Sequence, residues 1–281
     1  MRKIKEKISI DFEVEYDAVI WKGNLIPKTV YKYRNWDDIN HRKILEEISI
    51  WVPDSNNFND PFDCNIPIAY NLLSTDDAVA EKFIRNMVEN NKSKFPDGIE
   101  KEISRRLAEN KHKDPVFITG YTEDTLEANK KVNGVFSVTP VNNNILMWSH
   151  YANSHKGFCV GLDSVKLFEC LMGGGAPVNY ATEYPIISPI EIREEQYRQQ
   201  ILTKSKHWAY EFEYRLTTFR RNNMSIPIPP DAITEIIFGA KINNDFKTQI
   251  KRACNKLSHI KFFNSIPNEN EFKLNIVPEK T

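Results

Sequence analysis

The sequence has 281 residues, of which 41% are hydrophobic, and its 38 Lys and Arg side chains balance 38 Asp and Glu side chains. A chain of this length holds one large domain or two small ones and buries a substantial core. The zero net charge gives no global electrostatic case for binding to nucleic acid or to a membrane surface. There is no run of about 18 apolar residues, so no membrane span is expected.

The N-terminus and the cysteines indicate the compartment. Residues 1–7 are mostly charged and lack the apolar core of a signal peptide. The four cysteines are widely scattered and form no CxxC pair, so we expect reduced thiols, and neither a metal site nor a disulfide framework. These features together predict a cytoplasmic protein.

Short β-rich segments and one helix are expected in the first sixty residues. Alternating apolar residues predict a strand within residues 7–21. β-Branched and aromatic residues predict further strands at 29–34 and 48–52. Between these two strands, spaced apolar residues behind an acidic N-cap predict a helix at 37–47. Residues 54–63 are dense in turn-forming residues and predict a loop.

The next part of the chain differs in its pattern. Within residues 75–131 apolar side chains recur at helical spacing and Lys and Glu occupy the other positions, which predicts a helical insertion. Beyond it, strands are expected at 134–139, 157–162, 177–180, 233–238, 260–263 and 272–277, and helices at 145–152, 191–209 and 245–257. With no clear linker, we expect a single α+β domain over residues 1–281, built on a mixed, mostly antiparallel split sheet with flanking helices.

The stretch from Lys206 to Leu216 carries the clearest pattern. With a period of two, it predicts a strand that has one apolar face and one charged face with Glu211, Glu213 and Arg215. Carboxylates about 7 Å apart raise each other's pKa, and an adjacent Arg lowers both. Such a row is either a solvated face, with salt bridges worth about 0.2–1 kcal/mol each, or the lining of a cleft.

Several short segments, in this order along the chain, resemble a known family. They are Tyr31-Lys32-Tyr33-Arg34, Ile44-Leu45, Phe58-Asn59-Asp60-Pro61-Phe62-Asp63, Phe136-Ser137-Val138-Thr139, Met147-Trp148-Ser149-His150-Tyr151-Ala152, His155-Lys156-Gly157-Phe158, Lys204 and the run from Trp208 to Arg215. Together they span roughly residues 30–240 and resemble the DUF2971 family, whose function is largely unassigned.

A second, looser resemblance is to the ADP-ribosyltransferase fold. That fold carries a basic residue on its first strand, a Ser-x-Ser/Thr pattern on a middle strand and a Glu-x-Glu or lone Glu on a later strand. The counterparts here are Lys32 or Arg34, Ser137 and Thr139, and the pair Glu211 and Glu213. The chain departs from the fold's pattern in its long helical insertion, and the first-strand residue is usually His or Arg.

The resemblance implies an enzyme that uses NAD as a substrate. It would transfer ADP-ribose to a nucleic acid, a protein or water, as a toxin or phage-defence effector does. Breaking the nicotinamide–ribose bond develops an oxocarbenium-like cation. Glu213 would stabilise this cation, and Glu211 would orient or deprotonate the acceptor. Lys32 or Arg34 would engage phosphate or ribose.

The other candidates for NAD contact are hydroxyl-bearing or aromatic. Hydroxyl groups would buttress the site, aromatic rings would stack on nicotinamide or adenine, and a helix residue would donate to a phosphate or carboxylate. These residues are Ser137, Thr139, Tyr33, Trp148, His150 and Tyr151.

Two other classes of function stay open. A non-enzymatic module would bind a nucleotide or nucleic acid through basic and aromatic side chains, and it predicts a basic groove and no buried carboxylate. A metal-dependent hydrolase or nuclease would use Asp60 and Asp63 with Glu211 and Glu213, and it needs these carboxylates within coordination distance of one another. Each motif also has a plain structural interpretation, as a solvated strand face, a rigid turn or a packed helix.

Overall fold

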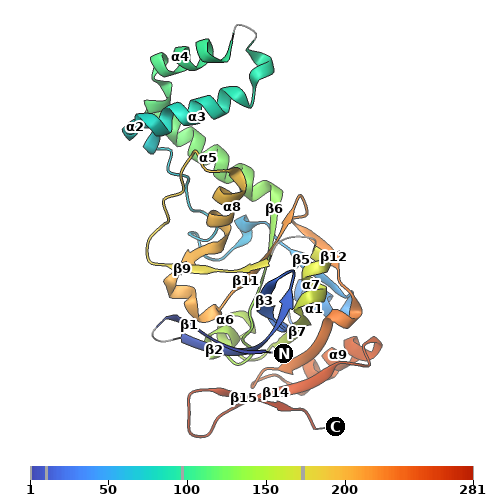
Figure 1. Cartoon of the computed structure of the whole chain (residues 1–281). Coiled ribbons are helices and arrows are strands. Elements are labelled where there is room, and N and C mark those ends of the chain that lie inside the picture. Colours follow the sequence, from blue (N-terminus) through green and yellow to red (C-terminus); the bar gives the residue numbers. More distant parts are fainter. Residues whose placement is uncertain (1, 10–11, 96–97, 172–174, 281) are drawn as a thin grey trace. The chain divides into compact units, whose positions relative to one another are not determined.

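The computed structural model describes residues 2–9, 12–95, 98–171 and 175–280. The chain divides into two compact units (Figure 1). The larger unit comprises Met1–Asn57, Asn133–Tyr180 and Lys206–Thr281, and the smaller unit comprises Phe58–Val132 and Ala181–Ser205. The predicted helical insertion at 75–131 therefore falls within the smaller unit.

A five-stranded sheet is the centre of the larger unit. Its order is β15-β14-β13-β7-β4, and β13 and β14 are parallel whereas the other neighbours are antiparallel. Its strands are β4 (Thr29–Arg34), β7 (Phe158–Asp163), β13 (Ile233–Phe238), β14 (Lys261–Pro267) and β15 (Leu274–Pro278). Helix α9 (Asn244–Ala253) lies in the connection between β13 and β14, because parallel neighbours need a crossover.

A three-stranded antiparallel sheet adjoins the edge strand β4. Its order is β6-β11-β8, with β6 (Asn133–Val138), β11 (Tyr214–Phe219) and β8 (Gly175–Pro177). An isolated bridge connects the two sheets: the Tyr31 N–H donates to the Thr139 carbonyl at 2.7 Å, and the Thr139 N–H donates to the Tyr31 carbonyl at 3.1 Å. Strand β6 therefore lies next to β11 in its own sheet and is bridged through Thr139 to β4, which carries Lys32 and Arg34.

The remaining elements of the larger unit surround these sheets. Strands β1 (Arg2–Ser9), β2 (Phe12–Trp21) and β3 (Asn24–Pro27) form an antiparallel meander, and β5 (Ser49–Val52) pairs with β12 (Met224–Pro227). The helices are α1 (Ile39–Glu46), α6 (Ile145–Tyr151) and α7 (Ser164–Leu171), and the short 3-10 turns are η1 (Ser55–Asn57), η4 (Lys206–Glu211), η5 (Pro230–Ala232) and η6 (Cys254–Lys256). This arrangement confirms the α+β class and the mixed, mostly antiparallel sheet.

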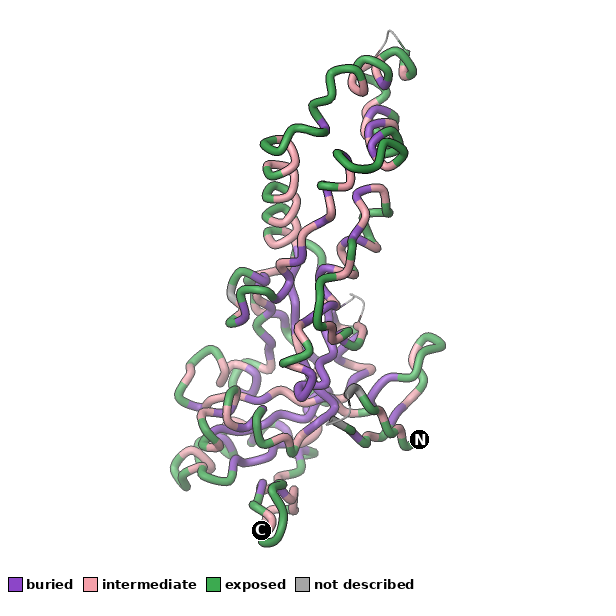
Figure 2. The backbone as a smooth tube through the Cα atoms, turned by 90° about the vertical axis from the view of Figure 1, so that its left-hand side faces the viewer, coloured by how far each residue is buried: buried purple, intermediate pink, exposed green. Residues whose placement is uncertain are grey.

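Strand β4 separates two hydrophobic clusters. The first cluster contains Val30 and the second contains Tyr33, and Figure 2 marks the buried segments of the chain in purple. Because strand side chains alternate between faces, Lys32 and Arg34 share the face of Val30, whereas Tyr33 lies on the opposite face. Cys159, opposite Tyr33 on β7, is fully buried, as the sequence predicts for a core residue.

The smaller unit is mainly helical. Its elements are α2 (Leu72–Thr75), α3 (Asp77–Glu89), α4 (Ile99–Glu109), α5 (Pro115–Val132), α8 (Arg193–Leu202), η2 (Lys92–Lys94), η3 (Lys111–Lys113) and β10 (Thr203–Ser205), and β9 (Asn179–Ala181) straddles the boundary. Asp76 caps α3 by accepting from the backbone N–H groups of Ala78 and Val79. None of the described helices has both the length and the apolar character needed to cross a membrane.

The prediction of one strand from Lys206 to Leu216 is wrong. Lys206–Glu211 form the 3-10 turn η4, and β11 begins only at Tyr214. Phe212 has a φ of 46°, a left-handed conformation that interrupts the extended backbone. Glu211 and Glu213 therefore do not share one strand face. Helix α8 likewise ends at Leu202, earlier than the predicted 209.

Candidate active site

Two buried glutamates precede β11. Glu211 is 3% exposed, Glu213 is 5% exposed and Arg215 is 1% exposed. The Arg215 guanidinium donates to both Glu213 carboxylate oxygens, from Nε to Oε1 at 2.8 Å and from Nη2 to Oε2 at 3.1 Å. Burial removes the Arg215 and Glu213 charges from water, which costs hydration free energy. The two hydrogen bonds between the guanidinium and the carboxylate offset much of that cost.

A tyrosine of helix α6 forms a hydrogen bond with the other glutamate, Glu211. The Tyr151 hydroxyl donates to Glu211 Oε1 at 2.6 Å. Burial, and then the Glu211 charge, raise the pKa of Tyr151, so the hydroxyl stays protonated and remains a donor. Asn144 caps α6 through its Oδ1, and its Nδ2 donates to the Tyr210 carbonyl at 2.8 Å. Asn144 thus fixes the helix end directly beside the segment that carries Glu211.

Ser137 links the basic strand to the acidic segment. On β6 it lies directly opposite Arg215 of β11 in the antiparallel register. Its carbonyl oxygen accepts a hydrogen bond from Lys32 Nζ at 2.5 Å, and this ammonium lies 4.9 Å from the centroid of the Phe136 ring. Lys32, Ser137, Arg215 and Glu213 therefore form a connected series across β4, β6 and β11.

Arg34 brings a half-buried cation to the end of β4. Its Nε is buried without a hydrogen-bond partner among the described residues. Burial lowers the pKa of Arg34 to about 10, so the guanidinium stays charged at neutral pH. His41 of α1 lies close by, and its Nδ1 accepts from the Asn35 N–H at 3.1 Å. A charged guanidinium with an unused donor is suited to binding an anion.

His41 makes stability depend on pH. Burial, and then the Arg34 charge, lower the pKa of His41 to about 4, against the partial opposition of Asp38. The unfolded chain therefore binds more protons between pH 6.5 and 4, so stability falls as the pH falls through this range. Allowing for the partial exposure of His41, we expect a loss of about 1 kcal/mol from this group.

Replacing His41 with Gln isolates this contribution. His112 and His155 also have lowered pKa values, mainly through burial, so the wild type contains similar contributions from them. Urea unfolding at pH 7.0 and 4.5 should show a smaller pH-dependent loss in His41→Gln than in the wild type. His150→Gln, which changes an exposed side chain, serves as the control and should leave the loss unchanged. Identical pH dependence in wild type and His41→Gln would contradict the expectation.

Three residues predicted to contact NAD, namely Tyr33, Trp148 and Thr139, stabilise the fold through their own contacts. The rings of Tyr33 and Trp148 pack edge to face at a centroid distance of 5.1 Å. The Tyr33 hydroxyl donates to the Val141 carbonyl at 2.8 Å, and Trp148 Nε1 donates to the Asn142 carbonyl at 2.9 Å. Thr139 Oγ1 accepts from the Val141 N–H at 3.1 Å. These contacts hold the segment between β6 and α6 in place.

The remaining residues that the sequence predicts for a functional site are His150, Asp60 and Asp63. His150 is exposed on α6 and stacks on Tyr210 at a centroid distance of 6.2 Å. In the smaller unit, Asp60 Oδ1 accepts from the Phe62 N–H at 2.9 Å, and Asp63 Oδ2 lies 3.5 Å from Lys204 Nζ. Among the described residues, no group of three or more His, Cys, Asp or Glu side chains is arranged to hold a metal ion.

The sequence did not identify every residue of this arrangement. Arg215 was noticed as a neighbour of the glutamates, but its spacing alone does not reveal that it is buried. Asn144 is of a residue type that favours helix caps, but its second hydrogen bond, to the Tyr210 carbonyl, has no sequence signal. His41 lies on a polar part of α1, and nothing in its local pattern predicts its proximity to Arg34.

A protein-family model described as a protein of unknown function, DUF2971, matches residues 147–216. The matched segment begins in α6 and ends in β11, so it contains Tyr151, Glu211, Glu213 and Arg215. This match confirms the resemblance to DUF2971 found in the sequence. Neither the curated proteins nor the solved structures include a match to the chain.

Proposed function

We propose that this chain, which carries the DUF2971 segment, cleaves NAD and transfers ADP-ribose to an acceptor or to water, as an enzyme of the ADP-ribosyltransferase type. The observation that carries the proposal is the adjacency of three strands: β4 is bridged to Thr139, which directly follows β6, and β6 is paired with β11. The basic residues, Ser137 and the two buried glutamates lie on these strands or directly before β11.

The two glutamates take different roles in this proposal. Arg215 donates to both oxygens of Glu213, so we assign Glu213 to holding the guanidinium in its place opposite Ser137. The neutral Tyr151 hydroxyl donates a hydrogen bond to Glu211 and so orients its carboxylate. Glu211 is therefore our choice for the carboxylate that stabilises the oxocarbenium-like cation, in preference to Glu213, which the sequence pattern favours.

The basic residues fit the phosphates of NAD. Arg34 Nε is a buried donor with no partner in the described part of the chain, and a diphosphate oxygen would satisfy it. Lys32 and Arg34 lie on the face of β4 opposite to Tyr33 and the cluster that includes Tyr151. A ligand that contacts both Arg34 and Glu211 would have to extend from one face of β4 to the other.

Two buried carboxylates favour an enzyme over the binding-module alternative, which predicts none. The direct test is nicotinamide release from NAD by the purified chain. We expect Glu211→Gln to lower kcat by about 10²-fold, because a charge that stabilises the transition state is lost. Tyr151→Phe should also lower kcat, whereas Arg34→Gln should mainly raise KM because it removes a binding contact.

A matched control distinguishes chemistry from folding. The hydroxyl groups of Tyr70 and Thr125 share a hydrogen bond of 3.1 Å within the smaller unit, so Tyr70→Phe removes a tyrosine hydroxyl bond that does not involve the acidic segment. It should leave nicotinamide release unchanged, and all variants should melt within a few degrees of the wild type. Absence of nicotinamide release from the wild type, together with absence of NAD binding by calorimetry, would refute the proposal.

A further inference from the structure

A cavity lies among α3, α4, η3 and α5 of the smaller unit. Its volume is about 160 Å³, and no residue of the proposed NAD site lines it. One part of its wall is apolar and is formed by Phe83, Ile84, Met87 and Phe117. An apolar cavity of about 150 Å³ holds a single benzene ring, so this space has room for one aromatic ring.

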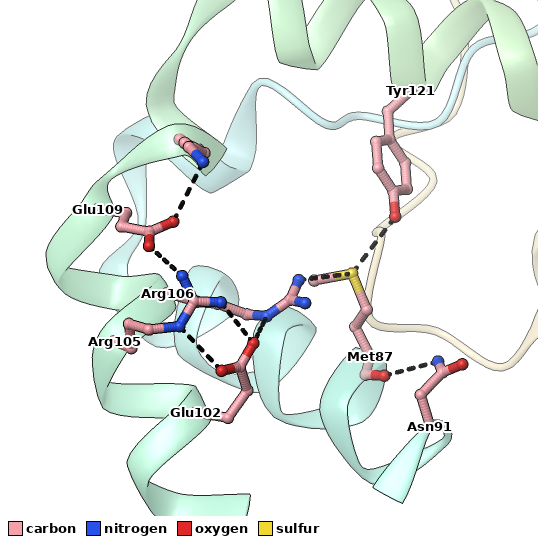
Figure 3. A network of polar contacts seen from close by, with 8 residues as sticks. Met87, Asn91, Glu102, Arg105, Arg106, Glu109 and Tyr121 are labelled. Atoms are coloured by element: carbon pink, nitrogen blue, oxygen red, sulfur yellow. Dashed lines mark hydrogen bonds and ion pairs between the residues drawn. The ribbon is translucent and has the colours of Figure 1, made fainter. Parts of the chain in front are cut away.

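The apolar wall is held in a fixed arrangement. Tyr121 of α5 donates its hydroxyl to the Met87 sulfur at 3.4 Å, and the same sulfur lies 3.8 Å from Nη1 of Arg106 (Figure 3). Phe83 packs edge to face against Tyr121 with a centroid distance of 5.7 Å. Met87 therefore lies where the aromatic wall meets a guanidinium, and its soft thioether suits contact with a ring.

The other part of the wall is charged. Arg105, Arg106 and Lys111 line the cavity together with Glu109. Arg105 binds Glu102 and Glu109, Arg106 Nε donates to Glu102 Oε1 at 2.6 Å, and Lys111 Nζ lies 3.3 Å from Glu109 Oε2 (Figure 3). Three cations face two carboxylates in this group, which leaves a surplus of one positive charge.

A buried histidine also lines the cavity. His112 is only 4% exposed, and its Nδ1 is buried without a hydrogen-bond partner among the described residues. Burial, and then the charge of Lys113, lower the pKa of His112, so its ring is neutral at pH 7. A buried nitrogen without a partner is unfavourable, and a ligand atom that bonds to it would remove this cost.

These observations identify one class of ligand. We propose that the cavity binds a small monoanion with a single aromatic ring, whose ring packs against Phe83, Met87 and Phe117. Arg106 and Lys111 hold its carboxylate, which accepts a hydrogen bond from Nδ1–H of His112 in the tautomer protonated at Nδ1. The ring matches the volume and the apolar wall, the single negative charge matches the surplus positive charge, and the carboxylate satisfies the unpartnered nitrogen.

Benzoate is the probe for this site, used with the full chain. Benzyl alcohol keeps the ring without the charge, and acetate keeps the charge without the ring. We expect saturable binding of benzoate in a titration followed by NMR, with at least tenfold weaker binding of each of the other two probes. Failure of benzoate to bind, or equally tight binding of benzyl alcohol, would overturn the proposal.

Matched arginine variants locate the binding. The side chains of Arg106 and Arg85 are 31% and 34% exposed, and each pairs with glutamates, but Arg85 does not line the cavity. Arg106→Leu should weaken benzoate binding about tenfold, whereas Arg85→Leu should leave it unchanged. Lys111→Gln changes a side chain that is 75% exposed, so it retains the fold and should also weaken binding. Equal effects of Arg106→Leu and Arg85→Leu, or full affinity in Lys111→Gln, would contradict the assignment.

Discussion

Arg215→Met is expected to lower the free energy of unfolding by about 3–5 kcal/mol, because it leaves Glu213 buried without its guanidinium. Arg215 is almost fully buried and donates to both oxygens of Glu213, so water cannot easily replace it. Urea titration gives the measurement: the midpoint should fall, with little change in the slope m. A loss below about 1 kcal/mol would mean that the pair is solvated.

The double variant separates charge from packing. In Glu213→Leu with Arg215→Met, both charges of the pair are removed together, so much of the lost stability should return. An exposed pair provides the control: Lys3 Nζ lies 3.1 Å from Glu15 Oε1 in the N-terminal meander, and both side chains are well exposed. Lys3→Met should change the free energy of unfolding by less than about 0.5 kcal/mol.

Local signals in the sequence were sufficient for several elements of the site. β-Branched and aromatic residues predicted β4 at its observed bounds, Thr29–Arg34. The acidic N-cap expected for the helix at 37–47 is Asp38, which accepts hydrogen bonds from the first turn of α1. These features depend on residues only a few positions apart, so the sequence contains the information that determines them.

The acidic segment shows where local reasoning fails. Alternation from Tyr210 to Leu216 is typical of a strand, yet Phe212 is left-handed and Glu211 belongs to a 3-10 turn. The partner of Glu211 is Tyr151, which lies 60 residues away along the chain. Burial of a carboxylate depends on such distant donors, and no pattern of neighbouring residues specifies where they lie. The burial of the site therefore became visible only in the structure.

Gly157→Ala is expected to cost about 3 kcal/mol or more of unfolding free energy, because the new methyl group meets backbone atoms. A Cβ at Gly157 would lie 2.1 Å from the Arg34 carbonyl oxygen and 3.0 Å from the Ala152 carbonyl oxygen. Neither atom moves without disturbing β4 or the loop after α6, where Gly157 N–H donates to the Ala152 carbonyl at 2.8 Å.

Gly120→Ala is the opposite case. Gly120 lies inside α5, and a Cβ there meets nothing within 4 Å. Since Ala favours a helix over Gly by about 1 kcal/mol, this variant should be stabilised. Circular dichroism in urea measures both variants, and equal stability of the two would contradict the close approach at Gly157. Because the clash falls on the backbone of Arg34, Gly157→Ala should also raise the KM for NAD under the proposed function. Gly157 therefore affects both the packing of β4 and the position of the Arg34 guanidinium.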